Sequence, residues 1–409
     1  MNLRATKACA LEGAGCRGFF FGMAETSNPL PHQYGCVSLG KNEKGKDAVS
    51  SVRVWLGLAL CVWLLLGSGW GQSAAAAGDQ EQSLTAPQTK EEGKAEGKEE
   101  AKEDKCPATF GPIITDTAIP IEKGKFALQT TFGVSFTTNN FSPSWRRISA
   151  GGDFKSLGVA TKLTYGLWNN LEVYAVIPYI HNWANNVQEP GPRGERAADF
   201  GGLGNILLTF KYRLVEETQT VPTVSAIFTP SFPTGHFRRL NPGRLGMDQL
   251  GSGSYNFTTG LNVSKYLSPF IVYGNLWYTM GTAYTSNEDR SPLVRDENGD
   301  LVEGDAVSTR VRNYPRDFVT VNLAAEYLMT KKWIALLELT STWEAGRLIG
   351  HKANVAPTPL LNLLPLSIVP GIEYMATDKF ALALGVKIDL VGKDAPANIA
   401  PFLSMVYAF

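Results

Sequence analysis

Nine charged side chains alternate with apolar residues in the part of the chain that follows Cys106. They are Lys162, Glu172, Lys211, Arg213, Glu326, Glu338, Glu373, Lys387 and Asp389. Every second residue of a strand points to the same face, so each charge lies on one face and the opposite face is almost free of charge. We predict that these nine side chains line the interior of a barrel as pore-lining candidates, together with Asn262, Asn275 and Asn322.

Other reactive residue types form no recognisable site. The histidines are scattered and make no ligand-spaced pair with each other or with a cysteine, so we predict no metal site; they are His32, His181, His236 and His351. Neither glycine-rich nucleotide-binding pattern occurs, and we predict no cofactor. A barrel enzyme needs a serine within reach of a base. No histidine belongs to such a motif, so we predict no enzymatic activity unless His236 or His351 bonds a serine.

About twelve segments alternate between apolar and other residues and predict β-strands. They are 126–136, 157–165, 171–179, 206–214, 223–230, 255–263, 270–279, 319–327, 333–343, 368–374, 380–390 and 399–409. The segment 270–279 is apolar on both faces, so its phase is ambiguous. The alternation by itself is also compatible with a soluble sandwich. A sandwich, however, would not need an uncharged face bounded by Trp or Tyr on every strand.

The connections between these segments alternate between long and short. The long ones are 137–156, 180–205, 231–254, 280–318 and 344–367, and the short ones include 166–170, 264–269, 329–332 and 376–379. Outer-membrane barrels have short periplasmic turns, long outer loops and an even strand count. The last strand ends on the aromatic pair Tyr407 and Phe409, which resembles the closing strand and assembly signal of such barrels. We predict an all-β, transmembrane, antiparallel up-and-down β-barrel of about 12 strands.

The N-terminal part predicts export. Basic residues precede an apolar core at 54–66, and small residues follow at 73–77, as in a cleavable signal peptide. A retained anchor and lipidation at Cys61 are the less favoured alternatives. The charged, low-complexity stretch 78–105 predicts a disordered linker. The predicted parts are therefore an N-terminal extension with signal peptide (1–77), a linker (78–105) and a barrel (106–409), and Cys106 is the one cysteine of the mature chain, without an internal disulfide partner.

The overall composition excludes one class of partner. The 409 residues carry a formal net charge of +0, so no basic field points to nucleic acid. Mean hydropathy is −0.09, a value that both soluble proteins and membrane barrels show, because only alternate barrel residues face lipid.

The part of the chain from Ile114 onward resembles the outer-membrane transporter family named for the meta-pathway of phenol degradation. The resemblance rests on 115–117, 163–173, 177–179, 202–205, 211–214, 231–235 and 250–255. The family has Asp where this chain has Asn205. The resemblance implies an outer-membrane barrel that transports small hydrophobic or aromatic compounds.

We therefore expect a passive channel in the outer membrane of a Gram-negative-type bacterium, with both termini in the periplasm. Its expected partners are the lipid bilayer, the outer-membrane assembly machinery and small solutes. A barrel of about 12 strands could be closed by an inserted segment, and the candidate plugs are 106–123 and the leucine-rich 356–367. The alternatives are a structural or adhesive barrel with a filled lumen and, ranked lower, an outer-membrane enzyme. The oligomeric state stays open.

Overall fold

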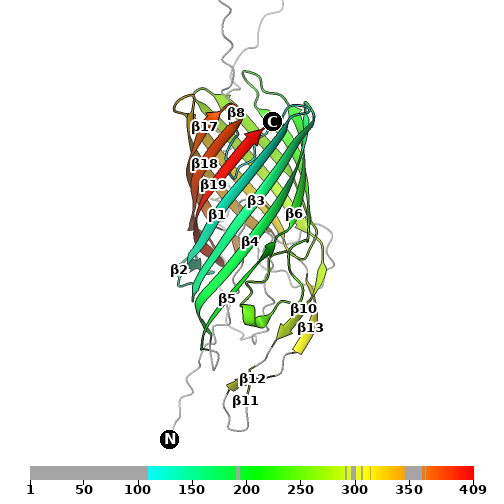
Figure 1. The fold of residues 1–409 in the computed structure, drawn as a ribbon, viewed down its shortest axis with the longest axis vertical. Coiled ribbons are helices and arrows are strands. Elements are labelled where there is room, and N and C mark those ends of the chain that lie inside the picture. The colour runs from blue at the N-terminus through cyan, green and yellow to red at the C-terminus, as the bar shows by residue number, and fades with distance from the viewer. Residues whose placement is uncertain are drawn as a thin grey trace, which may run out of the picture. The chain divides into compact units, whose positions relative to one another are not determined.

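The computed structural model describes residues 109–189, 194–290, 293–295, 301–304, 307–313, 315–345, 362–363 and 365–409. Twelve long strands form a closed antiparallel β-barrel (Figure 1). They are β1 (Phe126–Phe141), β3 (Asp153–Trp168), β4 (Leu171–Glu189), β6 (Ile206–Val215), β7 (Thr223–Phe232), β8 (Asn256–Leu267), β9 (Phe270–Gly281), β14 (Asp317–Leu328), β15 (Trp333–Ala345), β17 (Leu366–Thr377), β18 (Phe380–Val391) and β19 (Ala395–Ala408). The pairing of β1 with β19 closes the ring, which confirms the predicted fold class and strand number.

The two ends of the barrel differ. The turns that follow β3, β8, β14 and β17 are short, and β1 begins beside the C-terminus at the same end (Figure 1). There the N–H of Phe409 donates to the carbonyl of Phe126 at 2.8 Å. We call this end the short-turn end and the opposite end the long-loop end.

Several connections predicted as loops contain strand. The shorter strands are β2 (Arg147–Ile148), β5 (Gly194–Leu203), β10 (Tyr284–Arg290), β11 (Leu293–Arg295), β12 (Leu301–Glu303), β13 (Val307–Asn313) and β16 (Asn362–Leu363), and one 3₁₀ helix, η1, spans Pro242–Arg244. The connection 180–205 was wrongly expected to be a loop throughout, because β4 continues to Glu189 and pairs with β5. The inward alternation persists there, with Ile180 and Asn182 buried.

Strand phase follows the predicted alternation. Outward apolar side chains are exposed, for example Leu276 at 56% and Leu384 at 54%. Their inward neighbours are buried, for example Asn275 beside Leu276 and Ala383 beside Leu384. In β9, whose phase was ambiguous, Asn275 and Trp277 point inward, because Asn275 lies opposite Asn262 and Asn322 in the register. An apolar surface on this scale fits hydrocarbon better than water.

Aromatic pairs lie along the short-turn end of the outer surface. Trp333 and Tyr374 have ring centroids 4.6 Å apart, and Tyr407 and Phe409 lie 4.7 Å apart. Aromatic girdles of this kind mark the bilayer interface of outer-membrane barrels. Within the described ranges, no helix is long and apolar enough to cross a membrane.

Some predicted features lie outside the described residues. They are the signal peptide (1–77), the linker (78–105), Cys106, His32, His351 and most of the leucine-rich segment 356–367. They stay predictions.

Candidate functional site

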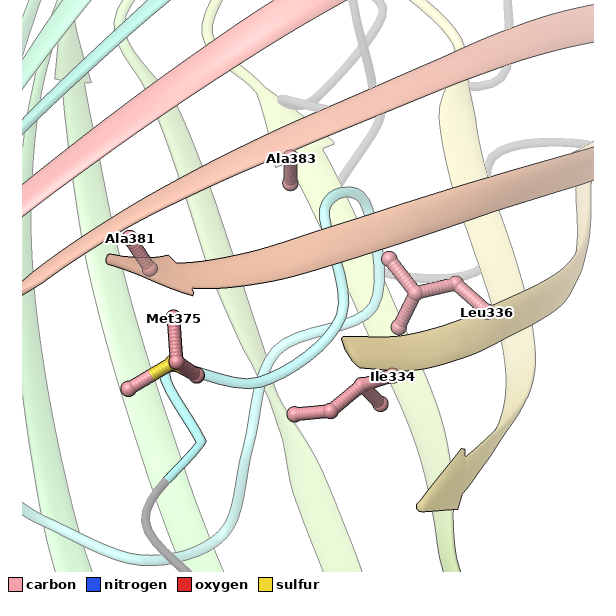
Figure 2. Close-up of a cluster of buried hydrophobic side chains, with 5 residues drawn as sticks. All are labelled: Ile334, Leu336, Met375, Ala381 and Ala383. Carbon is pink, nitrogen blue, oxygen red and sulfur yellow. The ribbon is translucent and has the colours of Figure 1, made fainter. Parts of the chain in front are cut away.

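Residues 109–121 precede β1 and lie inside the barrel, and we call them the plug. At the short-turn end, Phe110 and Ile113 of the plug pack against the buried side chains drawn in Figure 2. That cluster comprises Ile334, Leu336, Met375, Ala381 and Ala383, from β15, β17 and β18. The structure therefore places residues 109–121 of the plug candidate 106–123 inside the barrel.

A buried carboxylate on β15 holds the middle of the plug. Glu338 is 1% exposed and accepts the backbone N–H groups of Ile113 at 2.8 Å, Ile114 at 3.1 Å and Thr115 at 2.7 Å. Backbone N–H groups that leave water must find acceptors. An ionised carboxylate is a strong acceptor with room for several donors.

Two more glutamates, on the strands next to β15, also face the plug. Glu373 accepts the hydroxyl of Thr109 at 3.0 Å and the backbone N–H of Phe110 at 3.3 Å. Glu326 is fully buried and accepts the hydroxyl of Tyr273 at 3.0 Å. The acidic wall, Glu326, Glu338 and Glu373, thus receives the N-terminal half of the plug.

Side chains of β7, β8 and β9 hold the next residues. The amide of Asn275 accepts the N–H of Asp116 at 2.9 Å and donates to the carbonyl of the same residue at 2.8 Å. The hydroxyl of Ser264 accepts the N–H of Ala118 at 2.8 Å, and the hydroxyl of Ser225 donates to the carbonyl of Ala118. Backbone N–H and C=O groups of the plug are therefore both hydrogen-bonded to side chains of the wall.

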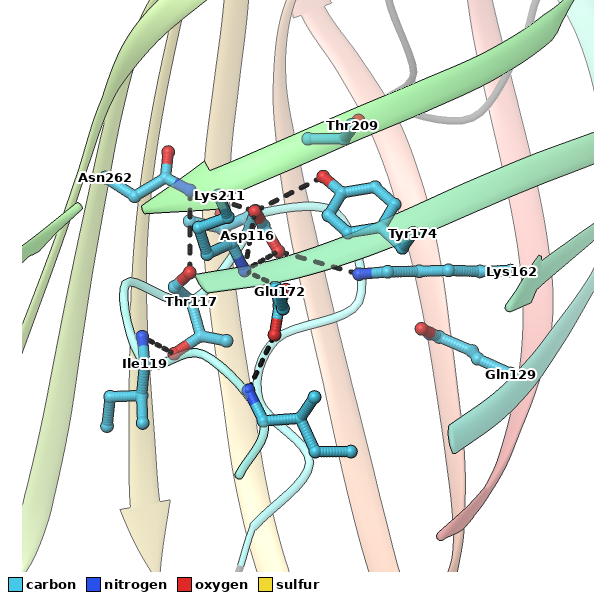
Figure 3. Close-up of polar contacts among 12 residues, drawn as sticks. Asp116, Thr117, Ile119, Gln129, Lys162, Glu172, Tyr174, Thr209, Lys211 and Asn262 are labelled. Atoms are coloured by element: carbon cyan, nitrogen blue, oxygen red, sulfur yellow. Dashed lines mark hydrogen bonds and ion pairs between the residues drawn. The ribbon is translucent and has the colours of Figure 1, made fainter. Parts of the chain in front are cut away.

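The carboxylate of Asp116 enters a cluster of charges on β3, β4 and β6 (Figure 3). Lys211, fully buried, lies 2.9 Å from an oxygen of Asp116 and 2.9 Å from Glu172. Glu172 also accepts the backbone N–H of Ile121 at 2.7 Å, and the amide of Asn262 donates to Asp116 at 2.9 Å. Buried ion pairs are stable only where such additional hydrogen bonds satisfy the remaining groups.

Asp116 lies outside the strands that form the wall, and its pKa is shifted. Burial acts to raise the pKa of this carboxyl, but the positive charges of Lys211 and Lys162 and the bonds from Lys211 and Asn262 outweigh it. The pKa of Asp116 therefore lies below its ordinary value, and the carboxylate is ionised at neutral pH.

Lys162 contacts the same carboxylate less closely. Its ammonium lies 3.6 Å from Asp116 and 4.0 Å from the centroid of the Tyr174 ring. The Lys162 side chain is 20% exposed, whereas that of Lys211 is 0% exposed.

A cavity of about 120 Å³ lies between the plug and the wall. Its apolar side includes the buried cluster Ala160, Val176 and Leu207, against which Tyr174 packs. Its polar lining includes Gln129, Thr131, Lys162, Thr209, Thr229, Thr258 and the plug residues Thr115, Asp116 and Thr117. A small solute could occupy this space without moving the plug.

The nine predicted site residues separate into groups. Lys162, Glu172 and Lys211 meet around Asp116, and Glu326, Glu338 and Glu373 form the acidic wall. Lys387 and Asp389 lie 4.0 Å apart on β18, where Asp389 accepts the hydroxyl of Ser367. Arg213 pairs with Glu216 at the end of β6. Residues of the first two groups contact the plug, so their predicted role of lining an open pore stays untested.

Sequence reasoning missed the role of Asp116. The only signal was its place in the motif 115–117 before the first strand. It also missed Ser225 and Ser264, since a serine on the inward face of a strand looks like any other small polar residue. Sequence reasoning also missed Tyr174.

Three motifs of the family resemblance, 202–205, 231–235 and 250–255, meet at the long-loop end. The hydroxyl of Thr234 donates to the carbonyl of Gly204 at 2.7 Å, and the amide of Asn205 donates to Ser252 at 2.8 Å. A Cβ atom on Gly235 would lie 2.8 Å from the Cα of Gly251. Asn205 therefore joins two loop bases, a structural role that needs no carboxylate.

The two described histidines, His181 and His236, each contact an aspartate residue. Nδ1 of His236 lies 2.7 Å from the carbonyl oxygen of Asp248, a backbone group. Nε2 of His181 lies 3.3 Å from Asp199. In the described part of the chain, no group of three or more His, Cys, Asp and Glu residues has the geometry to hold a metal ion.

Comparison with known proteins gives the fold. No protein-family profile and no curated protein sequence matches the chain. An outer membrane channel from Pseudomonas putida F1 is similar in structure, with a TM-score of 0.50 and 12% identity over 71% of this chain and 98% of that one. This chain has the fold of that barrel.

Two other solved barrels are more distant. They are a toluene transporter from Ralstonia pickettii (TM-score 0.36, 10% identity, 71% of this chain and 90% of that one) and the translocator domain of an autotransporter from Neisseria meningitidis (TM-score 0.35, 11% identity, 71% and 90%). At these scores neither adds to the assignment of the fold.

Proposed function

We propose that the protein is a channel in the outer membrane of a Gram-negative-type bacterium, for passive passage of small solutes, and that the plug closes it in the conformation described. The observation that carries this proposal is the plug itself, held across a polar lumen by side chains of the wall. The proposal assigns no catalytic residue.

The outer surface supports the membrane location. Outer-membrane barrels have an even strand number, short periplasmic turns and an apolar band between aromatic girdles. This barrel has twelve long strands, short turns at one end, exposed apolar side chains on its outer face and aromatic pairs at the short-turn end. By the same rule the short-turn end, with both ends of the barrel domain, faces the periplasm. In this proposal Tyr407 and Phe409 act as the assembly signal for the outer-membrane machinery.

The kind of contact that holds the plug supports its displacement. Most of the bonds join a wall side chain to the plug backbone, and water can replace each partner when the plug leaves. The plug also makes apolar contacts through Phe110 and Ile113, which pack against the cluster at the short-turn end. A lumen of 12 strands without the plug lies between the filled barrels of about 8 strands and the open porins of about 16.

The cavity bears on the solute. The family resemblance implies small hydrophobic or aromatic compounds. The buried apolar side of the cavity, Ala160, Val176 and Leu207, together with Trp277, supports a solute with a compact apolar body.

A structural or adhesive barrel with a filled lumen is the second candidate. The observation that favours it is the complete bonding of the fully buried Lys211 and of Glu338, which stabilises a seated plug. Planar-bilayer recording of the full chain separates the two. Discrete current steps, or steps that appear once Glu338 is replaced, support a channel. Silence of both forms in a correctly folded barrel refutes it.

A further inference from the structure

Lys162 has spare capacity for an anion. Its ammonium lies 3.6 Å from the nearest oxygen of Asp116, beyond the distance of a normal N–H···O hydrogen bond. Lys211, in contrast, lies at 2.9 Å from both of its carboxylate partners. Lys162 lines the cavity and Lys211 does not.

The neighbouring carboxylates have other partners besides Lys162. Asp116 is bonded by Lys211, by the amide of Asn262 at 2.9 Å and by the hydroxyl of Tyr174 at 3.4 Å. Glu172 is bonded by Lys211 and lies outside the cavity lining. Lys162 can therefore turn toward a ligand without leaving a buried carboxylate unpaired.

The cavity beside Lys162 is small, and one of its sides is apolar. Ala160, Val176 and Leu207 are 6%, 1% and 9% exposed and form one side of it. Its volume is about 120 Å³, and an apolar protein cavity of roughly 150 Å³ holds one benzene molecule. The cavity thus suits a single ring or a short branched chain.

We propose that this cavity is a binding site for a small organic carboxylate, whose anionic group pairs with Lys162 while its apolar body packs against Ala160, Val176 and Leu207. Hydroxyls of Thr131 and Thr209 line the same space and can donate to the second carboxylate oxygen. This inference rests on the proposed function, since the ligand would be a solute of the channel.

Titration calorimetry on the full chain in detergent micelles tests the site with benzoate and its neutral counterpart, benzyl alcohol. We expect saturable benzoate binding, weakened at least tenfold in Lys162→Gln and retained in Lys162→Arg. Benzyl alcohol should bind more weakly and equally to both forms. Lys155→Gln is the matched control, because this substitution removes the same charge from an exposed position on the same strand.

Equal benzoate affinity in the wild type and Lys162→Gln would overturn the proposal, as would equal affinity for the two probes. Heat-modifiable gel migration checks that each variant is folded. Should Lys162→Gln fail to fold, Ala160→Leu fills the cavity without changing charge and should abolish binding of both probes; unchanged binding there also overturns it. Bilayer current without selective benzoate binding would refute this site alone, whereas binding without any current would refute the channel.

Discussion

Replacing Glu338 with leucine tests whether the plug is a displaceable gate. The substitution removes the acceptor of the N–H groups of Ile113, Ile114 and Thr115. Leucine is similar in size to glutamate but has no polar group. A buried donor left without a partner costs about 1–3 kcal/mol. Three such donors destabilise the seated plug by roughly 3 kcal/mol at the lower limit.

That free energy sets the ratio of molecules with a released plug to molecules with a seated plug. Since about 1.4 kcal/mol corresponds to a factor of ten, the ratio of released to seated plug should rise about 100-fold or more. The barrel wall itself should stay intact, because Glu338 contributes no backbone bond beyond those of any β15 residue. Glu338→Gln keeps one carbonyl acceptor and should give an intermediate ratio.

Two measurements report on this ratio. The first is the open probability of single channels formed by the full chain in planar bilayers. The second is maleimide labelling of Thr115→Cys, in a background whose native cysteines are serine, because Thr115 is 2% exposed and protected while the plug is seated. Unchanged open probability together with unchanged labelling in Glu338→Leu would refute the reasoning that these bonds hold the plug.

Three further predictions concern the wall, the charge cluster and the junction of plug and barrel. Leu384→Arg places a charge on the lipid face, at a cost of about 2–4 kcal/mol near the midplane, and should block assembly, whereas Lys387→Leu on the inward face should still give heat-modifiable migration; equal tolerance of both would contradict the strand phase. Because the pKa of Asp116 is lowered in the seated plug, its contribution to plug stability is complete above the ordinary Asp value of about 4 and is lost as pH falls through the lowered pKa. The increase in channel opening on acidification should therefore be smaller in Asp116→Asn, which lacks this step, than in the wild type, and identical pH profiles would count against it. In Gly166→Ala the new Cβ would lie 2.0 Å from the carbonyl oxygen of Glu122, just before β1, whereas in Gly274→Ala the nearest atom is 3.7 Å away. The urea midpoint of unfolding should fall by the equivalent of about 1–3 kcal/mol in Gly166→Ala and change little in Gly274→Ala. The opposite order would be inconsistent with the plug's entry into the barrel.

The strands and their phase could be predicted from the sequence because each is a local property. Successive side chains of a strand point to opposite faces, so the placement of Glu338 between Leu337 and Leu339 already fixed which of them faces lipid. The exception was β9, where Trp277 and Leu276 are both apolar and the period carries no information. There the pairing with β8 and β14 decided the phase.

The sequence determined that a charged interior exists, and only the tertiary structure decided what fills it. Whether Glu338 faces water, a cation or a peptide depends on residues 223–225 positions away in the chain. No local pattern encodes such a contact, because the plug is bonded through backbone N–H groups that every non-proline residue carries. The same holds for Lys162 and Lys211. They are equivalent inward lysines in the sequence. The positions of Asp116 and Glu172 pair Lys211 closely on both sides and leave Lys162 facing the cavity.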